Sequence, residues 1–251
     1  MILLADIGNT HTHFGLARGA RIARHIDIAT RGWFRGDAAN QLRKWVATEN
    51  IEGLMVCSVV PQATPLLRRA VERIWKCEAL ELTPRTLRGV GIDYPKPRTI
   101  GPDRLANSVA ARRAYGAPVV VVDFGTAVTF DVVNRAGDYV GGIIAPGLAV
   151  MTDYLHEKTA LLPRIRIREI HSAIGKSTAG AMRAGAVHGY RGLVRELILK
   201  LRSELGSRQL PVVATGGYAE LIAKNLPEIA AVDPLLTLKG LQLVWQHHFG
   251  K

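Results

Sequence analysis

The fold of this chain is indicated most clearly by a sequence pattern that occurs near its start and again near its middle. Residues 2–10 read ILLADIGNT, and residues 119–127 read VVVVDFGTA. In both, a short apolar run rich in β-branched residues or leucine leads into Asp, an apolar residue and Gly, so each run predicts a buried strand that ends at a turn. An internal repeat of this kind indicates two related halves.

The residues after each turn continue the likeness. Residues 12–28 hold two apolar segments broken by Gly19, and residues 127–147 hold two segments broken by the turn at 134–137. Each half is therefore predicted to begin with three antiparallel strands. A Rossmann unit would place a helix directly after its first glycine turn, so this chain is expected to have a different fold.

Helical spacing of apolar residues predicts helices over 34–47, 103–115 and 190–205, and further strands are expected at 54–60 and 211–215. Gly116 follows the second helix as a C-terminal cap. The prediction is an α/β chain of two halves, residues 1–116 and 117–251.

The two Asp-x-Gly turns have the residue types that bind phosphate. Gly8 and Gly125 allow backbone N–H groups to approach a phosphate closely. One such turn is more often a plain strand cap, but two in equivalent places suggest a pair of phosphate-binding hairpins. A third glycine turn, at 215–217, is either a strand-to-helix loop or a wall for the adenosine end of a nucleotide. The neutral donors of the two hairpins are Asn9, Thr10, Thr12 and Thr126, and their carboxylates, suited to a cation, are Asp6 and Asp123.

Asp103 follows a stiff loop rich in Pro and Gly and precedes the helix expected at 103–115. One interpretation is a simple helix N-cap. The other is a catalytic base, kept ionised by the helix dipole and by Arg104, that accepts the proton of a substrate hydroxyl. Arg104 could clamp a substrate carboxylate with its planar guanidinium.

The chain has 33 basic and 21 acidic residues, a formal charge of +12. The basic residues are scattered and no aromatic residues alternate with them, which favours a solvated surface over a nucleic-acid site. No stretch approaches the roughly 20 apolar residues that cross a bilayer, and the first residues lack a basic leader, so a cytoplasmic protein is expected. Cys57 and Cys77 are predicted to be reduced and structural.

Taken together, several motifs resemble those of the type III pantothenate kinases, a family of the acetate and sugar kinase, Hsp70 and actin superfamily. The resemblance covers residues 1 to about 245. It is carried in order by Asp6–Thr10, Ser58–Pro61, Tyr94 with Gly101–Arg104, Asp123–Ala127, Gly141–Gly142 with Pro146–Gly147, and Ile174–Thr178.

The resemblance implies a duplicated ribonuclease H-like (actin-like ATPase) fold and transfer of the ATP γ-phosphoryl group to pantothenate, which opens coenzyme A synthesis. It implies Asp103 as the proton acceptor, Asp6 near magnesium, and Asp123 as ligand of a monovalent cation, K⁺ or NH₄⁺. It also implies a homodimer whose substrate pocket includes residues of the neighbouring subunit. The implied ATP site comprises Asp6, Ile7, Gly8, Asn9, Thr10, His11, Thr12, His13 and Thr126, and the implied pantothenate site Tyr94, Gly101, Pro102, Asp103, Arg104 and Thr178.

Two departures from the family pattern concern Pro102, where a smaller residue is usual, and the histidines His11 and His13. The histidines could form a metal pair, but exposed strand positions are the simpler interpretation. The alternatives are a kinase for another hydroxy acid, a phosphatase of the same superfamily, and a regulatory accessory protein. Retention of both hairpins with Asp103 argues against a purely regulatory role.

Overall fold

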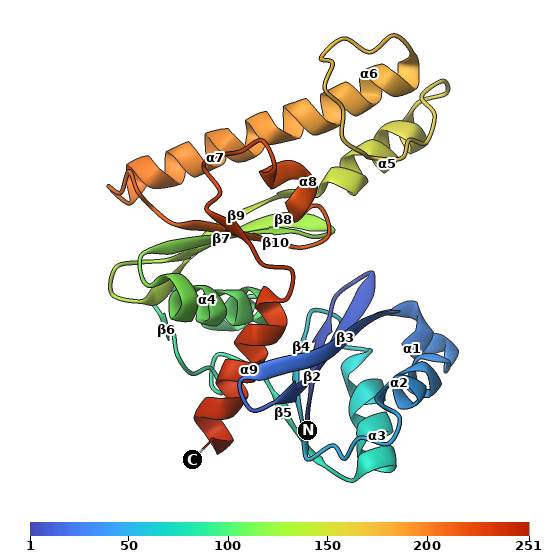
Figure 1. The fold of residues 1–251 in the computed structure, drawn as a ribbon, viewed down its shortest axis with the longest axis vertical. Helices are drawn as coiled ribbons and strands as arrows, with labels where there is room; N and C mark the ends of the chain where they lie inside the picture. Colours follow the sequence, from blue (N-terminus) through green and yellow to red (C-terminus); the bar gives the residue numbers. More distant parts are fainter. Residues whose placement is uncertain (251) are drawn as a thin grey trace. The chain divides into compact units, whose positions relative to one another are not determined.

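The computed structural model describes residues 1–250 and divides them into two compact units. Of these residues, the first unit comprises 1–116, 137–140 and 235–250, and the second comprises 117–136 and 141–234. The chain segments of both are drawn in Figure 1. The C-terminal segment, expected from its position to belong with the second half, packs with the first unit. The division into ribonuclease H-like halves at residue 116 stays a prediction.

The first unit is built on a five-stranded sheet of order β3-β2-β1-β4-β5. β1 pairs antiparallel with β2 and parallel with β4. The strands are β1 (Ile2–Ile7), β2 (His11–Arg18), β3 (Arg21–Ala29), β4 (Gly53–Ser58) and β5 (Glu78–Glu81), with β6 (Gly91–Ile92) beyond them. The helices are α1 (Arg31–Arg35), α2 (Ala38–Val46), α3 (Thr64–Trp75), the 3₁₀ turn η1 (Pro97–Thr99), α4 (Pro102–Tyr115) and α9 (Leu236–Phe249).

Alternate residues of β1 enter two different cores. Leu3, Ala5 and Ile7 pack with the buried faces of α1, α2 and α3. Leu4 packs on the other face, with residues of α4 and α9. The first sheet is therefore covered by helices on both faces, as the period of two along a buried strand requires.

The second sheet repeats the first. Its order is β11-β10-β7-β8-β9-β6, so β9-β8-β7-β10-β11 matches β3-β2-β1-β4-β5 position by position. β7 pairs antiparallel with β8 and parallel with β10, as β1 does with β2 and β4. The strands are β7 (Val119–Phe124), β8 (Ala127–Val133), β9 (Asp138–Pro146), β10 (Val212–Thr215) and β11 (Ala231–Val232). The helices are α5 (Leu148–Lys158), α6 (Thr178–Ala184), the π-helical turn η2 (Gly185–Gly189), α7 (Tyr190–Glu204) and α8 (Ala219–Ala223).

The matching strand orders confirm the duplicated architecture predicted from the repeat, and both sheets are mixed. One helix prediction was wrong in part: residues 34–47 do not form a single helix, because Gly36 adopts φ +85° and ends α1 before α2 begins. No helix within residues 1–250 is long and apolar enough to cross a membrane.

Candidate active site

The first Asp-x-Gly turn joins β1 to β2. The Gly8 N–H donates to the His11 carbonyl at 3.0 Å, and a side chain at Gly8 would meet that same oxygen. Asn9, Thr10 and His11 are exposed around the turn, where their side chains and N–H groups can reach a ligand. The turn therefore has the open backbone that a phosphate hairpin needs.

Thr12 lies on the inner side of the same turn. It is fully buried, and its hydroxyl lies 3.2 Å from the Thr30 hydroxyl and accepts a hydrogen bond from Trp33 Nε1 at 3.1 Å. The Thr30 hydroxyl in turn donates to the Gly8 carbonyl at 2.6 Å. Thr12 thus belongs to a polar chain that fixes the position of Gly8.

Asp6 stands one strand position before the turn and faces polar neighbours on both sides. It pairs in register with His13 on β2 and with Cys57 on β4. The Cys57 thiol donates to Asp6 Oδ1 at 3.2 Å. His13 Nδ1 contacts Asp27 Oδ1 at 2.7 Å, and this hydrogen bond lowers the pKa of Asp27. Neither Cys57 nor Asp27 was predicted to lie beside the hairpin.

The end of β4 is tied to the same turn. The Val59 N–H donates to the Ile7 carbonyl at 3.0 Å, and the Ser58 hydroxyl accepts from the Val60 N–H at 3.0 Å. The Ser58–Pro61 motif thus holds the ends of β1 and β4 in register.

Asp103 lies in the first turn of α4, whose N-cap is Gly101 and whose first residue is Pro102. The N-cap interpretation of Asp103 is therefore wrong. Its Oδ1 accepts the Arg104 N–H at 2.9 Å. Burial raises the pKa of the Asp103 carboxyl above its ordinary value, and the hydrogen bond and charge of Arg104 oppose only part of this rise. The expectation that its surroundings simply favour ionisation was thus wrong in direction, because burial outweighs the neighbouring positive charge.

The negative charges of Asp103 and Asp6 both affect the pKa of one buried thiol, that of Cys57. Burial raises the pKa of the Cys57 thiol well above its usual range, and the negative charges of Asp6 and then Asp103 add to the rise. The first unit contains both the predicted base and the first hairpin's carboxylate, and α4, which carries Asp103, shares a core with Cys57. Arg104 and Tyr94, which is 36% exposed, belong to the same unit.

The second Asp-x-Gly turn joins β7 to β8 and is enclosed by two further glycines. Gly216, with φ +90°, lies so close that a Cβ there would be 2.6 Å from Asp123 Oδ1. The Gly147 N–H donates to the Thr126 carbonyl at 3.1 Å, and a side chain at Gly147 would collide with the same carbonyl. The third glycine turn thus adjoins the second hairpin within the second unit.

Thr178 begins α6 in the second unit. The Ser177 hydroxyl caps this helix by accepting the Gly180 N–H at 3.1 Å, and Thr178 itself is exposed. Within residues 1–250, no group of three or more His, Cys, Asp or Glu side chains is placed to hold a metal ion.

Comparison with known proteins decides the family. The sequence profile of the type III pantothenate kinases matches residues 2–200. The chain belongs to this family. A type III pantothenate kinase of Akkermansia muciniphila is 48% identical over 242 residues, which cover 96% of each chain. One of Methylacidiphilum infernorum is 44% identical over 246 residues, covering 97% of this chain and 87% of the relative.

A solved structure from Campylobacter jejuni, named as a conserved Baf family transcriptional activator, superposes with a TM-score of 0.60. It is 19% identical, and 98% of each chain is covered. At this identity the likeness shows the fold alone. The fold is the actin-like ATPase fold, as the sequence predicted.

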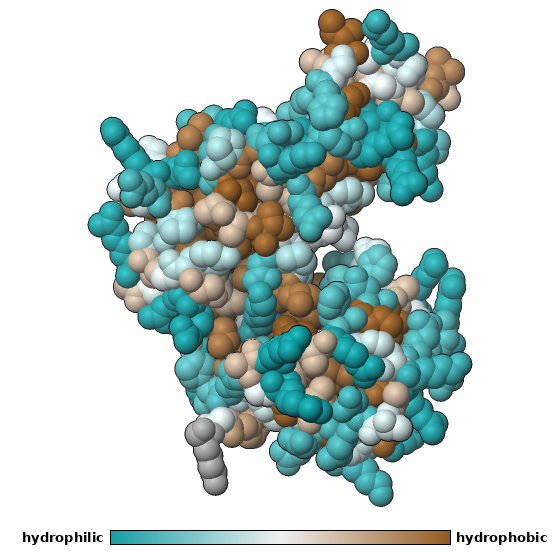
Figure 2. Space-filling view, viewed as in Figure 1, coloured by the Kyte–Doolittle hydropathy of each residue, from teal (hydrophilic) through white to brown (hydrophobic). Residues whose placement is uncertain are grey.

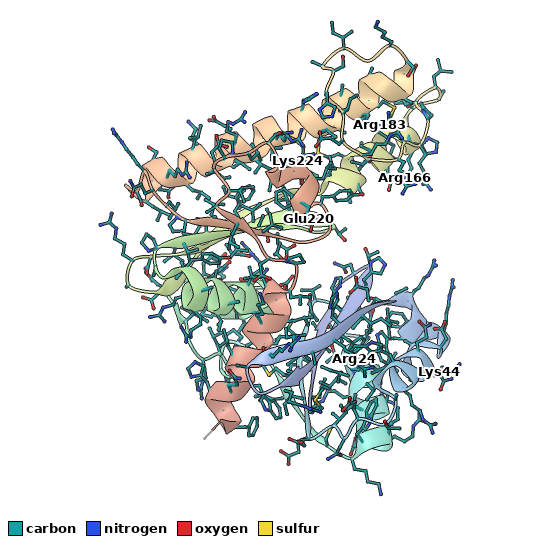
Figure 3. The ribbon with its side chains drawn as sticks, in the orientation of Figure 1. Arg24, Lys44, Arg166, Arg183, Glu220 and Lys224 are labelled. Atoms are coloured by element: carbon teal, nitrogen blue, oxygen red, sulfur yellow. The ribbon has the colours of Figure 1, made fainter. Side chains whose placement is uncertain are left out.

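Basic side chains of this type III pantothenate kinase family member are dispersed over both units. Figure 3 labels Arg24 and Lys44 in the first unit, and Arg166, Arg183 and Lys224 in the second. Arg24 lies over the Trp45 ring, 5.4 Å from its centroid, and Arg183 Nε donates to the Arg166 carbonyl at 3.3 Å. Two of these charged side chains, Arg24 and Arg183, thus contact other groups of their own chain.

Proposed function

We propose that the chain transfers the γ-phosphoryl group of ATP to the primary hydroxyl of pantothenate, the first step of coenzyme A synthesis. Membership of the family supports this activity. The structural observation that carries it is that Cys57, whose thiol donates to Asp6 Oδ1, packs in one core with Leu105 and Ala106 of the helix that carries Asp103, which supports a base near a phosphate hairpin.

Asp103 accepts the proton of the pantothenate hydroxyl. A base is most effective when its pKa lies near the working pH, and burial moves the Asp103 pKa in that direction. Pantothenate is held by Tyr94, Gly101, Pro102, Arg104 and Thr178. The Arg104 guanidinium faces the substrate carboxylate. Positioning and electrostatics supply most of the acceleration.

The phosphates of ATP bind along Asp6–His13 and at Thr126. Magnesium bound with ATP would offset phosphate charge, and Asp6 is a suitable neighbour because Mg²⁺ takes one or two carboxylates and otherwise phosphate and water oxygens. Asp123 is the proposed ligand for K⁺ or NH₄⁺. Its carboxylate lies against Gly216, whose missing side chain leaves room beside it.

We infer a cytoplasmic homodimer. The second unit exposes many large apolar side chains in and around α5 and along residues 159–177. They are Ile144, Val150, Met151, Tyr154, Leu155, Leu161 and Ile174, with exposed fractions from 39 to 89%. Figure 2 shows brown, apolar surface at this end of the second unit. Such a patch is typical of a protein interface.

Sedimentation tests the dimer. The wild type is expected at twice the chain mass, and Leu155→Glu at the mass of one chain, because a charge would enter the interface. Leu199→Glu changes an exposed leucine of α7 and is expected to leave the dimer intact. A monomeric wild type would contradict the proposal.

The activity is tested by ATP consumption with and without pantothenate, in potassium and then in sodium buffer. Turnover is expected only with pantothenate and potassium. Asp103→Asn is expected to lower kcat on the order of 10²-fold or more. Asp37→Asn, which changes an exposed aspartate beside α2, is the matched control and keeps full activity. ATP untouched in all four conditions would refute the assignment.

A further inference from the structure

Tyr139 is a fully buried side chain that touches two residues of the proposed pantothenate site. Tyr94 lies edge-on to the Tyr139 ring with centroids 6.0 Å apart and planes at 65°. The Arg104 guanidinium lies over the same ring, 5.7 Å from its centroid. Tyr139 itself is 0% exposed. All three residues belong to the first unit.

The backbone of Tyr139 also fixes the strand that leads into this region. β6 pairs parallel with the start of β9, with Ile92 opposite Tyr139. The Asp93 N–H donates to the Tyr139 carbonyl at 3.0 Å, one residue before Tyr94. The Tyr139 backbone therefore fixes the segment that leads to Tyr94, and the Tyr139 side chain contacts the Tyr94 ring.

We propose that Tyr139 is the positioning residue for pantothenate: its ring sets the directions of Tyr94 and Arg104 and thereby the affinity for the carboxylate end of the substrate. This inference rests on the proposed function and adds a residue to which no role in the site had been assigned. Arg104 has a long side chain with many rotamers, so a fixed aromatic face reduces the entropy lost when it binds. The buried ring cannot follow the substrate, so the geometry exists before binding.

The test is steady-state kinetics of the full-length protein with pantothenate and ATP varied separately. Tyr139→Leu removes the ring, and KM for pantothenate is expected to rise about tenfold, the size of one lost cation–π contact and one lost aromatic contact. KM for ATP is expected to stay within about twofold. Tyr139→Phe keeps the ring and is expected to restore KM for pantothenate to near the wild-type value.

Two further variants separate positioning from general damage. Phe130→Leu truncates a buried aromatic residue of the second unit and controls for lost packing. In an Arg104→Met background, Tyr139→Leu is expected to raise KM for pantothenate less than in the wild type, because the part of its effect that passes through Arg104 is already lost. If Tyr139→Leu does not fold, judged by circular dichroism, Tyr139→Met replaces it.

The inference is overturned if KM for pantothenate is unchanged in Tyr139→Leu, if both KM values rise together, or if Tyr139→Phe is as impaired as Tyr139→Leu. A wild type without pantothenate-dependent turnover overturns the proposed function, and this inference with it. Normal wild-type turnover with an unaffected Tyr139→Leu overturns the inference alone.

Discussion

Gly240 lies where the backbone of α9 comes close to the backbone of α4, and it offers a sharp test of how the first unit is packed. A Cβ on Gly240 would overlap the Ala106 carbonyl oxygen and lie 2.5 Å from its carbon. The obstacle is helix backbone, which no rotamer change can move, so in Gly240→Ala the two helices must separate. Ala106 follows Asp103 by one helical turn, and the shift therefore reaches the proposed base.

Two opposing effects set the magnitude. Alanine is favoured over glycine inside a helix by about 1 kcal/mol. Overpacking costs typically 1–3 kcal/mol, and a clash with backbone belongs at or above the upper end, about 3 kcal/mol. The expected net loss is about 2 kcal/mol, or a fall in Tm of roughly 4–8 °C for a chain of this size.

The matched control makes the same substitution where space is open. Gly192 lies in α7 and is exposed, and a Cβ added there would meet no atom within 4 Å apart from its chain neighbours and the adjoining backbone of its own helix. Gly192→Ala is expected to raise Tm by about 1–4 °C through helix propensity alone. Thermal unfolding followed by circular dichroism measures both. A Gly240→Ala variant as stable as the wild type, or a shift of the same sign in both variants, would refute this account of the α4–α9 contact.

The remaining predictions concern three sets of titratable groups. Because burial raises the pKa of Cys57 more than that of Cys77, a thiol reagent at pH 8 is expected to modify Cys77 first in the folded protein, and faster labelling of Cys57 would contradict this. The raised pKa of Asp103 means that ionisation of this carboxyl destabilises the fold. The destabilisation is absent below the ordinary pKa of 3.8 and complete above the raised pKa. Asp103→Asn is therefore expected to resist urea better than the wild type at pH 7 while losing activity. For the wild type, kcat/KM should fall as pH drops through that raised pKa, and a pH-independent acid limb would exclude Asp103 as the base. Glu169→Ala removes both carboxylate contacts of the buried Arg191, at 2.8 and 3.1 Å, while Arg191 keeps its bonds to the Leu221 and Ile222 carbonyls, so the expected cost in urea unfolding is roughly 1.5–3 kcal/mol. Hydrogen bonding to Arg191 lowers the Glu169 pKa below 4.5, so this contribution is present above 4.5 and disappears as pH falls through the lowered pKa.

The strands could be predicted from sequence because their signal is local. A buried strand followed by Asp-x-Gly needs only neighbouring residues to be recognised, and the equal strand orders of the two sheets follow from the repeat. The break between α1 and α2 was also visible locally, since Gly36 stands inside the apolar pattern that was interpreted as one helix.

What the sequence could not provide depends on contacts between distant segments. The last described helix, α9, was not predicted, and a local pattern would not show which sheet it packs against. Arg104 and the helix start are visible beside Asp103, whereas the burial that decides its pKa is not. Tyr139 lies far along the chain from Tyr94 and Arg104, and no local pattern connects the three.

The packing of α9 has a consequence for the order in which the protein can be made. Leu238, Leu241 and Val244 of this last helix complete the core that contains Leu4 and Met55, and Figure 1 shows α9 beside the strands formed by the earliest residues. Chains leave the ribosome from the N-terminus, so the core around the first strands cannot close until residues 236–249 have been made. During that interval one face of the first sheet is exposed and can bind chaperones. A chain that stops before residue 236 lacks the part of this core that covers its first strands.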